Sequence, residues 1–433
     1  MTAPPASASP RVAVVGLGYV GLPLALAMAR HFDTTGFDIN AARIAELRSG
    51  HDATGETPSS ELRATSLRLS DAPDVLDRCD IYVITVPTPV DADNRPDLAA
   101  VTSACAIVGG VMSEGAIVVF ESTVYPGVTE NVCGPALETA SGLRCGEDFF
   151  LGYSPERINP GDRAHTVDQI VKVLAGQTPD VTARLAELYG RVTEAGVFVA
   201  RDIRTAEAAK VIENAQRDIN IAFINEVAVI FNRMGLSTHD VLAAARTKWN
   251  FLDFQPGLVG GHCIGVDPFY LAHAAKENGY EPEVILSGRR INDNMAGFCA
   301  ERIDMVMRRD VTDGQPGRVL VLGLAFKENV PDLRNAKSVD LVRALEGRGH
   351  TVDVHDAMAD LAEAEALYGL KPISRLDPAG AYDCVVGAVP HAVYIAFSGK
   401  TLSSLVCEGG LIADLKGMWR HVQLPDHVRR WEL

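Results

Sequence analysis

The N-terminal part of the chain contains the pattern that most restricts how it can fold. An apolar run at residues 12–15 is followed directly by Gly16, Gly18 and Gly21, then by an apolar helical stretch to Arg30 and a second expected strand at residues 34–38. The order strand, glycine turn, helix, strand is typical of a parallel sheet, because parallel neighbours need a crossover connection. We therefore predict an α/β fold that begins with a doubly wound parallel sheet.

The same pattern predicts a dinucleotide site. Glycines at this spacing let the backbone approach a pyrophosphate at the N-terminus of a helix, and Asp38 ends the next strand, where an acid accepts hydrogen bonds from ribose hydroxyls. We predict NAD and not NADP, because a carboxylate at this position repels a 2′-phosphate. Arg43, one turn further on, either reaches the cofactor or lies solvated on the surface.

Two more apolar runs extend the predicted sheet, at residues 80–86 and 116–120, and each ends in a polar or proline-rich loop where such sheets bind ligands. Between residues 202 and 234 there is no Gly or Pro, and the apolar spacing predicts one long helix ended by Gly235. We expect this helix to join two domains and to pack against another subunit. The alternative is a helix that breaks without Pro or Gly.

The last third of the chain repeats the order of the first. After a Pro/Gly stretch at 313–317, strand-like segments at 319–323, 351–356, 382–390 and 410–416 repeat those at 12–16, 34–38, 79–87 and 115–121. Convergence on buried-strand composition is the alternative, but it does not explain the shared order. We predict two Rossmann-like doubly wound domains joined by a long central helix and a helical middle domain. The expected boundaries are a disordered tail at 1–10, an NAD-binding domain at 11–200, a central helical and dimerisation domain at 201–312, and a C-terminal Rossmann-like domain at 318–433.

The composition excludes several classes of protein. The 433 residues are 47% hydrophobic and 22% charged, as in folded globular chains, and their number predicts roughly three structural units. A net charge of −16 argues against binding to nucleic acid or anionic membranes. No apolar run approaches the roughly 18 residues of a membrane span, and residues 1–10 lack the features of a signal peptide, so we expect the cytoplasm.

The eight cysteines contain no Cys-x-x-Cys pair, which predicts reduced thiols and neither a disulfide framework nor a metal site. Cys263 differs from the others because it follows Gly260, Gly261 and His262 at an expected helix start. A lowered thiol pKa there would make it a nucleophile, and Asp267, four residues on, would face the same side. The alternative is a small buried cysteine in a glycine-rich crossing.

Lys210 and Asn214 stand one turn apart on the predicted long helix, so both project from one face. They are candidates for binding an oxyanion. An ion pair of Lys210 with Glu207 or Glu213 is the alternative.

In the C-terminal domain, residues 324–327 (Leu-Ala-Phe-Lys) replace the later glycines of the first turn. This turn cannot bind a dinucleotide as the first does. Lys327 either binds another phosphate, such as the diphosphate of a sugar nucleotide, or is a surface lysine.

Taken together, six segments resemble the nucleotide-sugar 6-dehydrogenase family, which includes UDP-glucose and N-acetylhexosamine uronate dehydrogenases. They are residues 16–23, 121–127, 154–161, the helix around Lys210, 260–268 and 323–329. His262 before the cysteine and Arg157 after the glutamate are similar to the N-acetylhexosamine branch. The resemblance covers the chain after residue 10 and points to the UDP-GlcNAc and UDP-GalNAc 6-dehydrogenases of capsule and O-antigen synthesis, with UDP-ManNAc or UDP-glucose as the alternative substrate.

The resemblance implies a four-electron oxidation of the C6 hydroxyl to a carboxylate, with two NAD+ consumed in turn. A cysteine-linked thiohemiacetal and then a thioester carry the sugar between the two oxidations. The implied roles are Cys263 as nucleophile, Thr123 and Asp267 as holders of the water that takes the hydroxyl proton, Lys210 and Asn214 as oxyanion ligands, and Glu156 as the base for hydrolysis.

The resemblance also implies the residues that bind each ligand. For NAD these are Gly16, Gly18, Tyr19, Val20, Gly21, Asp38, Arg43, Thr88, Ser122, Thr123 and Arg334, the last with a surface ion pair as alternative. For the UDP-sugar, expected on the C-terminal domain, they are Glu156, Arg157, Lys210, Asn214, Gly260 and Lys327. A homodimer through the central helix is implied, with neither nucleic acid nor membrane as partner.

Two other classes of function remain open from the sequence. A two-electron dehydrogenase of the hydroxyacid type would release one NADH per substrate and would not need Cys263. A non-catalytic regulator that binds NAD or a sugar nucleotide would be indifferent to changes at Cys263 and Lys210.

Overall fold

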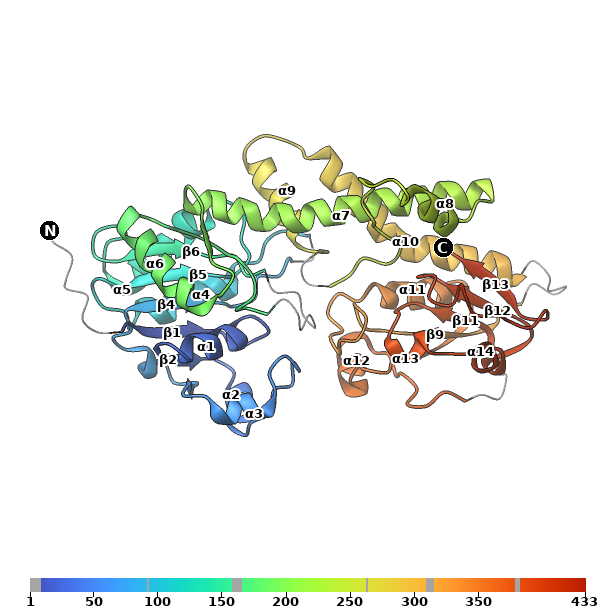
Figure 1. Cartoon of the computed structure of the whole chain (residues 1–433), viewed down its shortest axis with the longest axis horizontal. Coiled ribbons are helices and arrows are strands. Elements are labelled where there is room, and N and C mark those ends of the chain that lie inside the picture. The colour runs from blue at the N-terminus through green and yellow to red at the C-terminus, as the bar shows by residue number, and fades with distance from the viewer. Residues whose placement is uncertain (1–8, 92, 158–165, 262–263, 309–314, 378–381) are drawn as a thin grey trace. The chain divides into compact units, whose positions relative to one another are not determined.

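The structure, a computed structural model, describes residues 9–91, 93–157, 166–261, 264–308, 315–377 and 382–433. The chain forms two compact units, Met1–Glu213 with Phe269–Tyr280, and Asn214–Pro268 with Glu281–Leu433. Each unit contains one β-sheet with helices on it (Figure 1). The two units are described separately below.

The sheet of the first unit has its strands in the order β3-β2-β1-β4-β5-β6-β7-β8. The strands are β1 (Arg11–Val15), β2 (Asp33–Phe37), β3 (Arg68–Ser70), β4 (Ile81–Ile84), β5 (Ile117–Phe120), β6 (Phe150–Tyr153), β7 (Lys172–Gly176) and β8 (Val197–Val199). Neighbours run parallel except β6 and β7, which are antiparallel. The helical segments are α1 (Gly21–Ala29), α2 (Ala41–Arg48), α3 (Ser59–Ala64), η1 (Pro73–Leu76), α4 (Ala99–Gly109), η2 (Thr129–Cys133), α5 (Gly134–Ser141) and α6 (Pro179–Val192).

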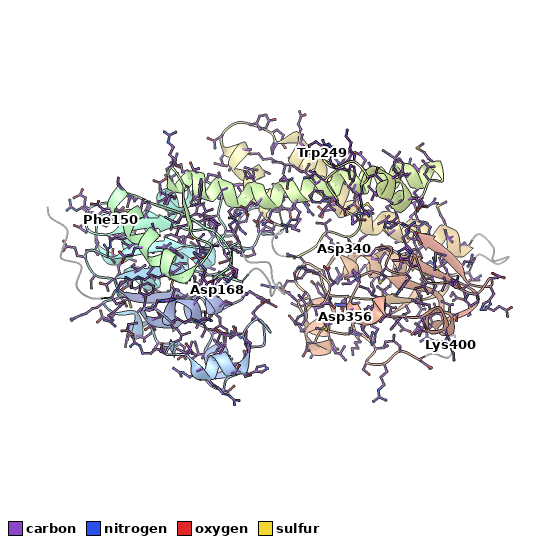
Figure 2. All side chains as sticks on the ribbon, in the orientation of Figure 1. Phe150, Asp168, Trp249, Asp340, Asp356 and Lys400 are labelled. Atoms are coloured by element: carbon purple, nitrogen blue, oxygen red, sulfur yellow. The ribbon has the colours of Figure 1, made fainter. Side chains whose placement is uncertain are left out.

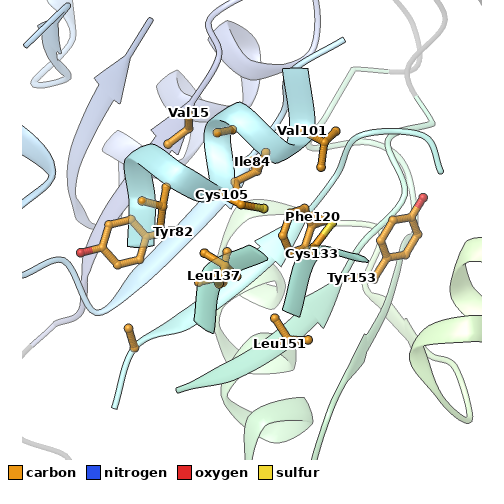
Figure 3. Close-up of a cluster of buried hydrophobic side chains, with 14 of the residues drawn as sticks. Val15, Tyr82, Ile84, Val101, Cys105, Phe120, Cys133, Leu137, Leu151 and Tyr153 are labelled. Carbon is orange, nitrogen blue, oxygen red and sulfur yellow. The ribbon is translucent and has the colours of Figure 1, made fainter. Parts of the chain in front are cut away.

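Strand alternation divides the core of the first unit into two clusters, one on each face of the sheet. In β1, Ala13 and Val15 join the cluster under α4 and α5, whereas Val12 and Val14 join the cluster under α1 and α6. Figure 3 shows the first cluster, in which Cys105 and Cys133 lie among the side chains around Phe120. Both faces are apolar because helices cover both, as a doubly wound parallel sheet requires.

The second unit contains a fully parallel sheet with its strands in the order β10-β9-β11-β12-β13. The strands are β9 (Arg318–Leu322), β10 (Thr351–His355), β11 (Tyr382–Gly387), β12 (Val406–Asp414) and β13 (Arg429–Glu432). The helices are α8 (Thr238–Ala245), α10 (Glu283–Arg308), α11 (Lys337–Glu346), α12 (Leu361–Tyr368), α13 (Ala392–Ile395) and α14 (Gly399–Leu405).

The predicted repeat is confirmed by the strand orders. The four repeated runs form β2-β1-β4-β5 in one sheet and β10-β9-β11-β12 in the other. The turns after the first strands also match, because Gly16 and Gly323 both have φ of +97°. Gly16 N donates to Phe37 O at 2.8 Å, and Gly323 N donates to His355 O at 2.9 Å. Both domains are therefore Rossmann-like, as expected.

The long helix is confirmed as α7 (Ile203–Met234), and it ends at Gly235, whose φ of +70° suits glycine. Helix α7 contributes to both units, as does α9 (Asp267–Glu277). The start of β12 differs from the sequence prediction, which placed it at Gly410. It begins at Val406, because Val406 pairs with Tyr382 and the register then shifts so that Leu411 pairs with Cys384, leaving the glycines in a bulge.

The described cysteines are free thiols, and most of them are buried. Within the described ranges, no three His, Cys, Asp or Glu side chains are grouped to hold a metal ion. No helix formed by the described residues combines the length and apolar character needed to cross a membrane.

Candidate active site

The turn between β1 and α1 has the shape of a pyrophosphate cradle. A Cβ on Gly21 would lie 1.8 Å from the carbonyl oxygen of Gly16, so only glycine permits this close packing of helix and strand. A Cβ on Gly18 would meet no atom within 4 Å, so the backbone there faces open space. Tyr19 and Val20 are half-buried beside it, just before α1. The turn fits a dinucleotide phosphate at a helix N-terminus.

Asp38 lies next to this turn at the end of β2. One carboxylate oxygen accepts from Leu17 N at 2.8 Å and the other from Asn40 N at 2.9 Å. A carboxylate has about four lone-pair sites, so these two bonds leave acceptor capacity for ribose hydroxyls. Asp38 is also partly exposed, which leaves it accessible to a ligand.

Arg43 supports the glycine turn from within. Its guanidinium donates to Leu17 O at 3.0 Å and forms ion pairs with Glu46 at 3.1 Å and Asp52 at 2.7 Å. Its side chain is only 11% exposed, so the alternative of a solvated surface arginine is wrong. The sequence missed Asp52, whose loop gives the arginine a buried partner. Direct contact of Arg43 with the cofactor stays a prediction.

At the ends of β4 and β5, side-chain hydroxyls link two loops. Thr88 Oγ1 donates to Thr123 O at 2.7 Å, and Ser122 Oγ donates to Val86 O at 2.6 Å. Tyr270, near the start of α9, donates its hydroxyl to Thr88 O at 2.9 Å. Three predicted site residues, Thr88, Ser122 and Thr123, therefore lie together at the carboxyl edge of the sheet, where such folds bind ligands.

Glu156 follows β6 and belongs to a buried charge cluster. Lys172 Nζ, at the start of β7, lies 3.4 Å from Glu156 Oε2 and 2.7 Å from Glu121 Oε2. Tyr189 on α6 donates its hydroxyl to Glu121. The sequence analysis missed Lys172, Glu121 and Tyr189. A single lysine within the apolar run at residues 170–175 was the signal that could have found Lys172.

Burial and mutual charge shift the titration of this cluster. Burial raises the pKa of Glu121 to about 7, although the Lys172 ammonium opposes the shift. Burial alone would lower the pKa of Lys172, but the carboxylates of Glu121 and Glu156 raise it above its ordinary value. The pKa of Tyr189 is raised well above its ordinary value, first by burial and then by Glu121. Lys172 is therefore an ammonium at neutral pH.

Lys210, on α7, is 8% exposed, and the described residues give it no ion pair or hydrogen bond. The two acids that the sequence offered as partners are engaged elsewhere. Glu213 pairs with Arg157 at 2.9 Å, and Glu207 accepts from Thr129 N at 2.9 Å. The alternative of a salt-bridged Lys210 is therefore wrong for the part of the chain that the structure describes, and its buried ammonium is available to a ligand.

Asn214 lies one turn further along α7 and is fixed by an acid. Its Nδ2 donates to Asp267 Oδ2 at 2.6 Å, and both side chains are buried. Asp267 is the first residue of α9. Cys263 and His262 lie outside the described residues, so the predicted placement of Cys263 beside Asp267 stays a prediction.

The loop that precedes Cys263 is held by groups that the sequence did not reveal. Asn225 on α7 donates to Gly257 O at 3.0 Å and accepts from Gly257 N at 2.8 Å. A Cβ on Gly260 would lie 2.4 Å from Asn335 O, so glycine is required where the loop passes this backbone. The predicted substrate residue Gly260 is thus packed against the loop after β9.

In the second unit, Asp356 (Figure 2) directly follows β10, as Asp38 directly follows β2, but it has no such acceptor capacity. One of its oxygens accepts from Leu324 N and Ala325 N, and lies 3.1 Å from His391 Nε2. The other accepts from two backbone N–H groups of the next turn. Although burial favours the neutral acid, His391 and the backbone donors lower the pKa of Asp356. Asp356 therefore lacks the acceptor capacity that Asp38 has in the first unit.

Two predicted ligand residues lie on the loop after β9. Lys327 is half-buried there. Arg334 forms an ion pair with Asp332 at 2.6 Å, with its side chain 42% exposed. The ion pair that the sequence left as the alternative for Arg334 is present, and its contact with the cofactor stays a prediction.

These two Rossmann-type units, one of them with a glycine turn and an adjacent acid that suit a dinucleotide, define an NAD-dependent oxidoreductase. Sequence profiles of the UDP-glucose/GDP-mannose dehydrogenase family match nearly the whole chain. The NAD binding domain matches residues 10–193, the central domain 204–294 and the UDP binding domain 320–421. The chain belongs to the UDP-glucose/GDP-mannose dehydrogenase family.

Individual relatives are similar over nearly their full lengths. UDP-N-acetyl-D-glucosamine 6-dehydrogenase of Pseudomonas aeruginosa is 50% identical over 94% of this chain and 96% of its own. Protein CapL of Staphylococcus aureus is 49% identical over 98% of this chain and 99% of its own. The solved structure of the UDP-D-ManNAc dehydrogenase of Pyrococcus horikoshii is 28% identical, covers 97% of this chain and 98% of its own, and has a TM-score of 0.87.

Proposed function

We propose that this chain oxidises the C6 hydroxyl of UDP-N-acetylglucosamine to the carboxylate, with two NAD+ and one water consumed and two NADH and three protons released. The observation that carries the chemistry is the buried Lys210, which has no carboxylate partner among the described residues, one turn from Asn214. An ammonium and an amide in that arrangement suit a developing oxyanion. The substrate follows from the relative with 50% identity.

NAD+ held at the Gly16–Gly21 turn supplies the hydride acceptor for each oxidation. Thr123 and Asp267 hold the water that takes the hydroxyl proton of the sugar. The Cys263 thiolate then adds to the aldehyde carbon as a thiohemiacetal, which keeps the reactive intermediate bound. Lys210 and Asn214 stabilise the negative oxygen in both oxidation steps.

After the second oxidation the sugar is a thioester of Cys263. Glu156 takes a proton from water, the water oxygen bonds to the acyl carbon, and the C–S bond breaks to return the Cys263 thiolate. In the second unit, Lys327 is proposed to bind the diphosphate of the sugar nucleotide. The uronate product is suited to polysaccharide synthesis, and the free thiols of the described residues fit a reducing compartment, the cytoplasm.

We also propose a homodimer through α7. Within the second unit, Phe223, Ile230 and Met234 share one face of this helix and are 60%, 47% and 63% exposed. Their spacing of seven and four residues forms an apolar stripe. A second copy of the same stripe would cover it with closed two-fold symmetry.

The deciding experiment counts NADH released per limiting sugar with UDP-GlcNAc, UDP-GalNAc, UDP-ManNAc and UDP-glucose in parallel. Two NADH from UDP-GlcNAc are expected. One NADH per sugar would replace the proposal with a two-electron dehydrogenase, and none from any sugar would favour a binding protein. Cys263→Ser is expected to abolish uronate formation, and full turnover by this variant would overturn the thioester step.

A further inference from the structure

Lys172 occupies an unusual position for a lysine. It is the first residue of β7, its side chain is fully buried, and its ammonium lies between two carboxylates from different segments. Glu121 follows β5 and is 1% exposed, whereas Glu156 follows β6 and is 5% exposed. Burying an ammonium is costly unless it is paired and hydrogen-bonded. The sheet holds both partners in place, so the pairing is set by the fold.

The two carboxylates are held differently. Glu121 is the closer partner at 2.7 Å, and its other oxygen accepts the hydroxyl of Tyr189. Glu156 gives Oε2 to Lys172 at 3.4 Å, while its Oε1 accepts from the backbone N–H of Arg157 at 2.6 Å. Both oxygens of Glu156 are therefore directed, one by a charge and one by the backbone.

Arg157, the next residue along the chain, has an acidic partner of its own. The guanidinium of Arg157 pairs with Glu213 on α7 at 2.9 Å. Lys172 is thus a cation that faces the Glu156 carboxylate, with Glu121 as a competing acid and Tyr189 bonded to Glu121. An opposite charge within about 4–6 Å favours the ionised form of a carboxyl group.

We propose that Lys172, anchored by Glu121 and Tyr189, is a positioning residue that orients the Glu156 carboxylate and keeps it ionised for the hydrolysis step. This inference rests on the proposed role of Glu156. It also assigns a function to Glu121, which competes with Glu156 for the Lys172 ammonium. An ionised Glu121 weakens the electrostatic attraction between Lys172 and Glu156. Lys172 does not touch the reacting atoms.

The inference predicts opposite effects for two variants. Glu121→Gln removes the competing negative charge, so the Lys172 ammonium interacts more strongly with Glu156. In the plot of kcat against pH, the fall in rate on the acid side (the acid limb) then moves to lower pH. Lys172→Met combined with Glu121→Gln removes the cation with its acid, so the acid limb moves to higher pH by about one unit or more. The double variant preserves the charge balance of the buried site, which protects folding.

Hydrolysis can be followed specifically by the mass of the denatured enzyme. The double variant is expected to accumulate the acyl-enzyme on Cys263 below neutral pH while KM for the UDP-sugar stays unchanged. Lys172→Arg keeps the cation and is expected to retain the acid limb of the wild type. A purely structural role for Lys172 would lower the unfolding temperature of the double variant without moving the limb or trapping acyl-enzyme.

Glu207→Gln is the matched control, because Glu207 is another buried carboxyl of the same unit with its pKa raised by burial to about 7. Glu207 accepts from Thr129 N, and among the described residues it has no bond to Lys172. The acid limb of the Glu207→Gln variant is therefore expected to stay where it is in the wild type. Carboxyl 13C spectra, with Glu156→Gln used to assign the Glu156 signal, give its titration midpoint without turnover. A midpoint that moves with neither variant overturns the inference about Lys172. The NADH count of the wild type decides the proposed function separately.

Discussion

The side-chain amide of Asn214 donates to the buried carboxylate of Asp267 at 2.6 Å, which ties the middle of α7 to the first residue of α9. The bond fixes which way the amide of Asn214 faces, since the nitrogen must point at the acid. Its second N–H remains available as a donor. Because Cys263 stands four residues before Asp267, this bond also anchors the chain shortly after the proposed nucleophile.

Asn214→Ala is expected to destabilise the protein by about 1.5–3 kcal/mol, because it removes a hydrogen bond to a buried carboxylate. It also removes a proposed oxyanion donor, so kcat should fall by about 100-fold. Asn220→Ala removes a hydrogen bond on an exposed part of the same helix and should change stability by less than about 0.5 kcal/mol. Urea unfolding and steady-state kinetics measure both effects; equal stability losses in the two variants would contradict the prediction.

Lys210→Met separates catalysis from stability. The described residues give the Lys210 ammonium no ion pair, so its removal is expected to leave the unfolding free energy unchanged or raised by up to about 1 kcal/mol. In contrast, kcat should fall by about 100- to 1000-fold. Lys400→Met, an exposed lysine on α14 (Figure 2), should alter neither quantity. A large stability loss for Lys210→Met would mean that the lysine has a structural partner.

Variants in the glycine turn are expected to separate NAD binding from stability. Gly18→Ala is expected to weaken NAD binding at least about tenfold without loss of stability, because its Cβ would enter the open space above the turn. Gly21→Ala should destabilise the fold, since its Cβ would collide with the Gly16 carbonyl oxygen. Gly190→Ala, within α6, has its nearest contact at 3.8 Å and should stabilise by about 0.5–1 kcal/mol. NAD titration of the three variants measures the expected change in affinity, and thermal unfolding measures the expected changes in stability.

Glu207 makes stability depend on pH. Burial raises its pKa in the folded protein to about 7 from an ordinary value of 4.5. As the pH rises between those values, the unfolded chain loses this proton before the folded protein does. The contribution of Glu207 to the free energy of unfolding is therefore complete below pH 4.5 and declines as the pH rises to 7. Relative to wild type, the free energy of unfolding of Glu207→Gln should increase by up to about 3 kcal/mol as the pH rises from about 5 to about 8. Unfolding at the two pH values measures this gain, and Glu187→Gln, on the surface of α6, should show none.

The proposed homodimer interface on the apolar face of α7 can be tested by introducing charges into it. Phe223→Glu with Ile230→Glu should convert a dimer to monomers in sedimentation velocity, because it places charges in the proposed interface. Both side chains are exposed in the described chain, so the monomer should remain folded. Leu367→Glu, an exposed apolar residue on α12, should leave the dimer intact. A wild type that sediments as a monomer would contradict the interface.

Sequence patterns located the features that depend on neighbours along the chain. The glycine turn with Asp38, the length of α7 and the repeat of four strands follow from local periodicity and turn chemistry, and the structure has all of them. The boundaries of β12 were predicted less well, because its first residues form a bulge set by pairing with β11. Strand β7 and its antiparallel pairing with β6 were not predicted at all.

What the sequence alone determined is thus the class of fold and the glycine turn for NAD, and it supplied a set of candidate site residues, because each is encoded in a short segment. Only the tertiary structure decided how those side chains are charged and held. Lys172, Glu121 and Glu156 come together because β5, β6 and β7 are neighbours in the sheet, although 51 residues separate Lys172 from Glu121. Burial then raises the pKa of Glu121, and Glu207 and Glu213 have partners other than Lys210. Such partnerships depend on distances across the sheet, which no spacing along the chain contains.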